Sequence, residues 1–280
     1  MPAAPTAALA ALLAVAAVDA PPPPASGFQT FSEAGVYLPA DKIFVPSHMD
    51  SPAPLVVILH GCEQDADAIA AVARWNALAE KEGFLVLYPN QQWGRNPYNC
   101  WNWFVPINQA PGLGEQAEII AAIFAAKARY PVDPARVYAA GISAGASTVV
   151  DLLSCYPDVF AGGGVHSGVA YGIALNPVDA LDVMKNGPGS RARAGLCDPA
   201  AFRGGVMIVQ GSADTVINPA NADRIAADFS GATVRTVLVP GLGHAWSGGA
   251  PDLPASDPKG PDATALMWSF FSGAHIKRAD

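Results

Sequence analysis

Gly141-Ile142-Ser143-Ala144-Gly145 is the stretch of this sequence that decides the fold. It follows an apolar run at residues 136–140 and precedes residues 144–155, which can form a helix. A serine on so tight a strand–turn–helix connection needs small neighbours, because a side chain at either glycine would crowd the backbone. Similar pentapeptides occur in ordinary Gly/Ser-rich turns. In this context, however, the pattern predicts a nucleophilic serine held at the C-terminal edge of a sheet.

The composition indicates a folded protein with a large core. The chain has 280 residues, of which 51% are hydrophobic and 14% are charged, and such a composition argues against disorder. The net charge is −8, from 16 Lys and Arg against 24 Asp and Glu, and no basic run is present. We therefore expect no nucleic-acid partner and no membrane partner. We also expect the protein to be a monomer.

The N-terminal segment is typical of export. Residues 1–20 are nearly all Ala, Leu and Val, and the apolar part at 7–18 is too short to span a bilayer. Val15-Ala16-Ala17 suits signal cleavage, and four prolines at 21–24 predict a stiff, extended spacer. We expect a signal peptide and spacer over 1–27, one domain over 28–280, and a secreted or periplasmic protein. The alternative is a plain N-terminal tail.

The cysteines favour the same compartment. An even count with export predicts two disulfides, and none of the four has metal-site spacing. The strands before Cys62 and Cys100 are expected to be neighbours, so these two cysteines can pair, which leaves Cys155 with Cys197. In a cytosolic protein all four would be buried thiols. A thiol nucleophile at Cys62 is disfavoured, because no base lies near it in the sequence and Ser143 already has the turn.

Apolar runs alternate with helical patterns along the rest of the chain. This alternation predicts an α/β fold of the α/β-hydrolase type, with a mostly parallel central sheet and helices on both faces. Residues 167–204 show little periodicity and are expected to be an excursion over the sheet edge. The expected strands are 42–45, 55–60, 84–88, 136–140, 162–166, 205–210 and 234–239. The expected helices are 67–82, 115–130 with Ile119, Ile120, Ile123 and Phe124 on one face, 144–155, 219–229 and 263–271.

A serine hydroxyl needs a base, and the base needs an acid that fixes its tautomer. In α/β-hydrolases these residues follow the serine in the order acid, then histidine. Asp214 comes just after the strand that ends at Gln210, and His244 comes just after the last predicted strand. The alternative interpretation is that Asp214 is a helix cap or a turn residue with no catalytic role. We predict Ser143, Asp214 and His244 as a catalytic triad.

The other four histidines fit the role less well. His48 and His275 lie in terminal or surface contexts, and His60 precedes a Gly-Cys turn. His166 ends the short strand after the helix at 144–155 and is the reserve candidate for the base.

A developing oxyanion needs preorganised donors, usually two backbone N–H groups. One is expected from Ala144, directly after the nucleophile. The other is expected from the turn after the strand at 55–60, where we choose the N–H of Cys62.

Three tryptophans are candidates for substrate binding. Trp101 and Trp103 follow Cys100 in an aromatic cluster, and Trp246 follows His244. Aromatic clusters are often part of the core, but beside an active site they also form apolar walls. Both interpretations remain open for these three residues.

Several stretches together resemble one known family. They are His60-Gly-Cys-Glu-Gln-Asp65, Arg74-Trp-Asn-Ala-Leu-Ala79, Tyr88-Pro89, Cys100-Trp-Asn-Trp-Phe104, Gly141-Ile-Ser-Ala-Gly145 and Gly243-His-Ala-Trp246. Over roughly residues 40–273 the chain resembles the poly(3-hydroxybutyrate) depolymerase family of esterases, which includes feruloyl and acetylxylan esterases. The resemblance implies an α/β-hydrolase fold, secretion, and a serine mechanism without cofactor or metal. It supports the predicted triad and the Cys62 oxyanion donor.

The expected activity is hydrolysis of carboxylic esters through an acyl-enzyme, with polyhydroxybutyrate or related polyesters as substrate. Secreted depolymerases of the family often carry a polymer-binding domain after the catalytic domain, whereas this sequence stops soon after Phe271, so we expect no strong adsorption to solid polymer. Feruloyl or acetylxylan ester hydrolysis is therefore the alternative. A non-catalytic binding protein on the same fold is a second alternative. A peptidase or an acyl transferase would use the same triad.

Overall fold

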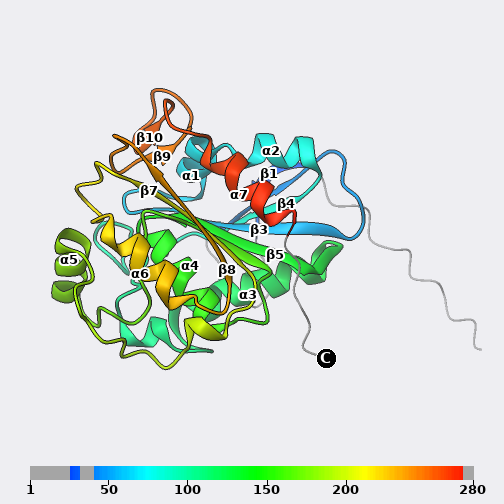
Figure 1. Cartoon of the computed structure of the whole chain (residues 1–280). Coiled ribbons are helices and arrows are strands. Elements are labelled where there is room, and N and C mark those ends of the chain that lie inside the picture. Colours follow the sequence, from blue (N-terminus) through cyan, green and yellow to red (C-terminus); the bar gives the residue numbers. More distant parts are fainter. Residues whose placement is uncertain (1–25, 32–40, 274–280) are drawn as a thin grey trace, which may run out of the picture.

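The computed structural model describes residues 26–31 and 41–273, and its centre is a twisted sheet (Figure 1). The predicted signal peptide and spacer lie outside these ranges except for residues 26 and 27. The strands of the main sheet are β1 (Gly27–Thr30), β2 (Lys42–Val45), β3 (Ala53–Leu59), β4 (Leu85–Tyr88), β5 (Val132–Ile142), β6 (Gly162–His166), β7 (Gly205–Gly211) and β8 (Thr233–Val239).

The strand order is β1-β2-β4-β3-β5-β6-β7-β8. The pairs β1–β2 and β2–β4 are antiparallel, and every pair from β4 to β8 is parallel. All seven residues of β3 are buried, as expected for a central strand covered on both faces. Because parallel strands share one C-terminal edge, the turns after β3, β5, β7 and β8 meet there.

Helices cover both faces of the sheet, as Figure 1 shows. One face carries α1 (Ala66–Ala73), α2 (Trp75–Glu82) and α7 (Ala263–Phe271). The other carries α3 (Gly114–Arg129), α4 (Ala144–Cys155) and α6 (Ala220–Asp228). Successive β3 side chains alternate between the two cores, with Leu55 and Val57 in one and Val56 and Ile58 in the other. The remaining elements are α5 (Pro177–Asn186), the short 3₁₀ helices η1 (Pro106–Gln109) and η2 (Pro199–Ala201), and a small pair β9 (Trp246–Ser247) and β10 (Ser256–Asp257).

The predicted helix at 67–82 is two helices, so that prediction was wrong in its continuity. Arg74 has φ 57° and ends α1, with its N–H donating to the Ala70 carbonyl. Its guanidinium donates to the Gly248 carbonyl at 2.6 Å and to the Asp262 carboxylate at 3.0 Å. These contacts to distant residues stabilise a left-handed backbone that a local pattern does not reveal.

One further prediction is corrected. Phe124 does not share the buried face of α3 with Ile123, because its side chain is 56% exposed and lies beneath the Lys127 ammonium. The segment 167–204, in which the sequence shows little periodicity, contains α5 and η2. No helix within 26–31 and 41–273 has both the length and the apolar character needed to cross a membrane.

Candidate active site

Ser143 sits on a sharp turn between β5 and α4. Its backbone has φ 57° and ψ −121°, a conformation that costs a non-glycine residue of order 1–3 kcal/mol. Its N–H donates to the His166 carbonyl at 3.0 Å, and its carbonyl accepts from the Ser147 hydroxyl at 3.1 Å. The turn is thus held at both ends, and Ser143 stands at the C-terminal edge of the sheet as the sequence predicted.

Asp214 and His244 are paired at the same edge. The Nδ1 atom of His244 lies 2.9 Å from Oδ2 of Asp214, whose side chain is fully buried. Oδ1 of Asp214 accepts from the N–H groups of Val216 and Ile217 at 2.9 and 2.8 Å. Burial alone would raise the pKa of Asp214, but the hydrogen bond and charge of His244 and the two N–H donors outweigh it and lower the pKa. The carboxylate therefore stays ionised and holds His244 with Nδ1 toward it.

Ser143 and His244 line one cavity of about 730 Å³. Its wall is mostly apolar, and Trp103 and Phe104 form part of it. A cavity of this size and polarity suits the acyl part of a substrate. Ala144, the residue directly after the serine, also lines it.

The turn after β3 supplies a further part of the wall. We call residues 60–62 the oxyanion turn, after the donor that the sequence predicts at Cys62. The N–H of Gly61 donates to the Gln64 side chain at 2.9 Å, and the N–H of Glu63 donates to the Tyr98 carbonyl at 2.7 Å. Among the described residues, no group accepts a hydrogen bond from the N–H of Cys62, which lies between them. Cys62 itself lines the cavity.

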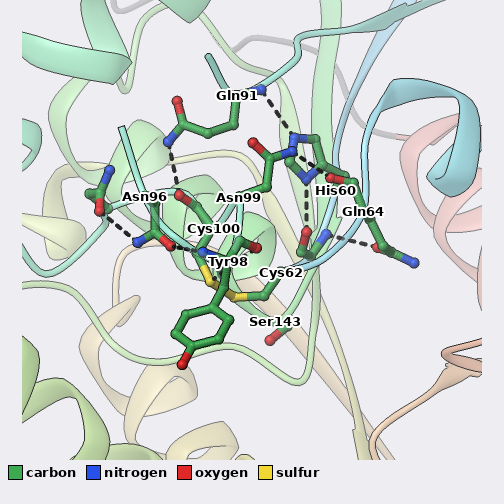
Figure 2. The surroundings of a disulfide bond; sticks show 12 residues. His60, Cys62, Gln64, Gln91, Asn96, Tyr98, Asn99, Cys100 and Ser143 are labelled. Atoms are coloured by element: carbon green, nitrogen blue, oxygen red, sulfur yellow. Dashed lines mark hydrogen bonds between the residues drawn. A yellow bond between two sulfur atoms is a disulfide. The ribbon is translucent and has the colours of Figure 1, made fainter. Parts of the chain in front are cut away.

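Two disulfides are present, and they join the pairs expected from the sequence. Cys62 is bonded to Cys100, and Cys155 is bonded to Cys197. Figure 2 shows the first bond close to Ser143, where it ties the oxyanion turn to the loop that carries Trp103.

The reserve candidate His166 lies away from the cavity wall. It is fully buried, its Nε2 accepts from the Ser247 N–H at 3.1 Å, and its ring stacks on Trp246. Burial, with a smaller effect of His244, lowers its pKa to about 3. His166 is therefore a neutral core residue whose carbonyl supports Ser143.

Of the three tryptophans, Trp103 lines the cavity and the other two do not. Trp101 is buried against the His60 ring, with the ring centroids 5.3 Å apart. Trp246 is fully buried and donates from Nε1 to the Thr264 hydroxyl. The expectation that Trp101 and Trp246 contact substrate is corrected accordingly, because both belong to the core that supports the site.

Helix α5 supplies a part of the cavity wall that was not predicted from the sequence. Pro177, Ala180, Leu181 and Met184 line the cavity. Their spacing of three, four and seven residues is that of one helical face. The Asn176 side chain caps the helix and Gly187 ends it, so the start and stop signals were also present.

A second groove, more polar than the first cavity, lies beside it and is called the polar groove. It measures about 560 Å³ and shares Glu63, Gln64, Pro97 and Tyr98 with the first cavity. Acidic and amide side chains dominate its wall, and Trp93 at its rim is 91% exposed. Within the described part of the chain, no cluster of three His, Cys, Asp or Glu side chains could hold a metal ion.

The parallel sheet, the turn at Ser143 and the acid–histidine pair after later strands define an α/β-hydrolase. The chain belongs to the family described as Esterase PHB depolymerase, whose model matches residues 36–235.

Named relatives include a poly(3-hydroxyalkanoate) depolymerase C of Paucimonas lemoignei, 38% identical over 193 residues. The match covers 66% of this chain and 46% of the depolymerase, so the chain spans about half of that relative. Feruloyl esterase B of Thermothelomyces thermophilus is 28% identical over 201 residues, covering 67% of this chain and 68% of the esterase. Among solved structures, an acetyl xylan esterase from Aspergillus awamori matches with a TM-score of 0.69 and 18% identity. It covers 88% of this chain and 99% of its own. At that identity the likeness concerns the fold.

Proposed function

We propose that this protein is a secreted serine esterase that hydrolyses carboxylic esters through an acyl-enzyme. The observation that carries the proposal is the Asp214–His244 hydrogen bond, because the histidine that it holds lines the same apolar cavity as Ser143. Ser143 is the nucleophile, His244 the general base and acid, and Asp214 the residue that orients His244.

The reaction has two steps. In the first, the Ser143 hydroxyl attacks the ester carbonyl while Nε2 of His244 takes its proton, and the oxyanion is stabilised by the N–H groups of Cys62 and Ala144. His244 then gives the proton to the leaving alcohol as the acyl-enzyme forms. In the second step water attacks the acyl-enzyme and loses a proton to His244. His244 then returns this proton to Oγ of Ser143 as the bond to the acyl group breaks, which releases the acid and restores the free enzyme.

Replacing the nucleophile tests this proposal. Ser143→Ala is expected to lower kcat for p-nitrophenyl butyrate by several orders of magnitude without unfolding the protein. Ser154→Ala is the matched control, since Ser154 is a buried serine on α4, the helix that follows Ser143, and its hydroxyl donates to the Val150 carbonyl. Activity of Ser143→Ala within tenfold of the wild type would refute the assignment.

For the substrate, we propose polyhydroxyalkanoate polyesters or their oligomers. The apolar cavity suits a short aliphatic acyl unit, and the depolymerase from Paucimonas lemoignei is among the relatives of this chain. Secretion is supported by the two disulfides, which persist in oxidising compartments.

Esters of plant-wall polysaccharides are a second candidate, favoured by the polar groove. Sugar hydroxyls can pair with its carboxylates and amides, and the exposed rings of Trp93 and Tyr98 can stack on sugar faces. Incubation with polyhydroxybutyrate film, feruloylated arabinoxylan and acetylated xylan, followed by mass analysis of the products, distinguishes the two. Release of hydroxybutyrate oligomers alone supports the polyester. Release of ferulate or acetate alone supports the polysaccharide ester.

A further inference from the structure

We propose that His60 is a positioning residue that sets the orientation of the oxyanion donor, acting through the Gly61–Cys62 peptide group. This inference rests on the proposed esterase function and adds a residue that is not part of the triad. His60 lies at the end of β3 and is fully buried, and Figure 2 shows it between Gln91 and Cys62.

The His60 side chain makes a hydrogen bond within its own turn. Nδ1 of His60 lies 2.8 Å from the carbonyl oxygen of Gly61. A carbonyl oxygen only accepts, so Nδ1 carries the proton and donates it. This bond fixes the direction of the Gly61 carbonyl.

The rigid geometry of the peptide group links this hydrogen bond to the Cys62 N–H. In a trans peptide the C=O of one residue and the N–H of the next point in opposite directions within one rigid plane. The Gly61 carbonyl and the Cys62 N–H belong to the same plane. A Gly61 carbonyl held toward His60 therefore directs the Cys62 N–H away from His60, and both Gly61 and Cys62 line the cavity that contains Ser143.

The hydrogen bonds of the His60 ring also fix its tautomer. The backbone N–H of Gln91 donates to Nε2 of His60 at 3.1 Å, so Nε2 must be the unprotonated nitrogen. Burial, only partly offset by the Gly61 hydrogen bond, lowers the pKa of His60 to about 4. The imidazole is thus neutral at ordinary pH, with its one proton on the nitrogen that faces Gly61.

The bonds around His60 form a closed ring. The Gln91 side chain donates to the Cys100 carbonyl at 2.9 Å and to the Glu115 carboxylate at 2.6 Å. Cys100 returns to Cys62 through the disulfide (Figure 2). The ring of bonds from His60 through Gln91 and Cys100 back to Cys62 gives the peptide plane little freedom to rotate.

Two nearly isosteric replacements test the proposal. In His60→Asn, the amide nitrogen can take the place of Nδ1 and donate to the Gly61 carbonyl. In His60→Leu, a side chain of the same branched shape has no donor. We expect kcat of His60→Asn on p-nitrophenyl butyrate to stay within about tenfold of the wild type. We expect His60→Leu to lose a further tenfold or more, approaching the ~10²–10³-fold cost of removing an oxyanion donor. KM should change little in either variant.

A transition-state analogue separates positioning from simple destabilisation. A trifluoromethyl ketone forms a hemiketal with Ser143 whose oxyanion needs the same N–H groups. Its Ki should rise in His60→Leu by about the factor by which kcat/KM falls, measured well below the melting temperature. The proposal is overturned if folded His60→Leu matches His60→Asn in kcat and Ki. If instead the wild type hydrolyses no ester, it is the proposed function that fails.

Should His60→Leu not fold, Gln91→Pro provides the second variant, because proline removes the N–H that donates to Nε2. It should lower kcat with little change in KM, and an unchanged kcat would overturn the proposal.

Discussion

Gly145 lies so close to Leu59 that a Cβ atom on Gly145 would be 2.3 Å from the Leu59 carbonyl oxygen. The same atom would be 2.5 Å from the carbonyl oxygen of His60. The start of α4 therefore packs directly on the backbone at the end of β3. The turn at Ser143 and the oxyanion turn are held together by this contact, which only glycine permits.

Gly145→Ala should accordingly displace one turn from the other. We expect the variant to lose nearly all esterase activity and to melt at a lower temperature, because backbone carbonyls cannot move aside as a flexible side chain can. Gly243→Ala is the control, since Gly243 precedes His244 yet has open space where a Cβ would be added. Activity on p-nitrophenyl butyrate and thermal melting of both variants check the prediction. A Gly145→Ala protein that is as active as Gly243→Ala would contradict it.

The two disulfides form a matched pair for separating stability from catalysis. Their cysteines are 38 and 42 residues apart in sequence, so chain entropy assigns each about 4 kcal/mol of stabilisation. Of the two bonds, only Cys62–Cys100 joins residues that line the cavity of Ser143, and Cys62 is the proposed oxyanion donor. Replacing either pair by serines should lower the free energy of unfolding by similar amounts. Removing Cys62–Cys100 should also lower kcat by about tenfold or more, below the full cost of losing an oxyanion donor. Equal kcat values in the two double variants would count against the assigned donor.

Helix α5 should influence which lengths of acyl chain the protein binds. Leu181 lines the cavity and is 66% exposed, so a long acyl chain can cover it. Leu181→Ala is expected to raise KM for p-nitrophenyl octanoate by about fivefold, which corresponds to about 1 kcal/mol of lost apolar burial. KM for the acetate should not change. Val178→Ala removes a 76% exposed side chain from the same helix outside the cavity and should alter neither constant.

Burial of neutral histidines predicts a loss of stability in acid. His60 and His166 have pKa values lowered to about 4 and about 3 by burial, whereas an unfolded histidine titrates near 6.5. The unfolded chain therefore binds more protons below pH 6.5, and this part of the stability is present above pH 6.5 and lost as pH falls toward the folded pKa. Between pH 6.5 and pH 5 each histidine should contribute a loss of about 2 kcal/mol.

Urea unfolding at pH 7 and pH 5 measures this contribution. The stability difference between the wild type and His60→Asn should shrink by about 2 kcal/mol on going to pH 5. His48→Asn removes an exposed histidine and provides the comparison. A difference that stays constant across the two pH values would show that His60 is not a buried neutral group.

The fold and the site geometry were predictable where local chemistry decides the structure. The continuous apolar run of β3 indicates a strand buried on both faces. The two glycines around Ser143 indicate a turn that no larger residue fits. Ser143, Asp214 and His244 each follow a parallel strand, so their meeting at the C-terminal edge that such strands share was also predictable.

The features that could not be predicted depend on contacts between residues far apart in sequence. Arg74 adopts a left-handed backbone because Gly248 and Asp262 bind its side chain, and nothing near Arg74 in the sequence indicates this. Trp246 follows His244 closely but belongs to β9, where its ring packs inward against His166. Proximity in sequence to an active-site residue did not indicate the direction of its side chain.

The segment after β7 has two attachments at once. Its N–H groups at Val216 and Ile217 bind Asp214, and a few residues later the N–H of Asn218 donates to the Met184 carbonyl at the C-terminal end of α5. The part of the cavity wall that α5 supplies is thus fastened to the same short stretch of backbone that binds the Asp214 carboxylate. Redesigning α5 to widen the range of substrates would therefore also disturb the backbone that binds Asp214. Substrate range and turnover number are expected to change together in this protein.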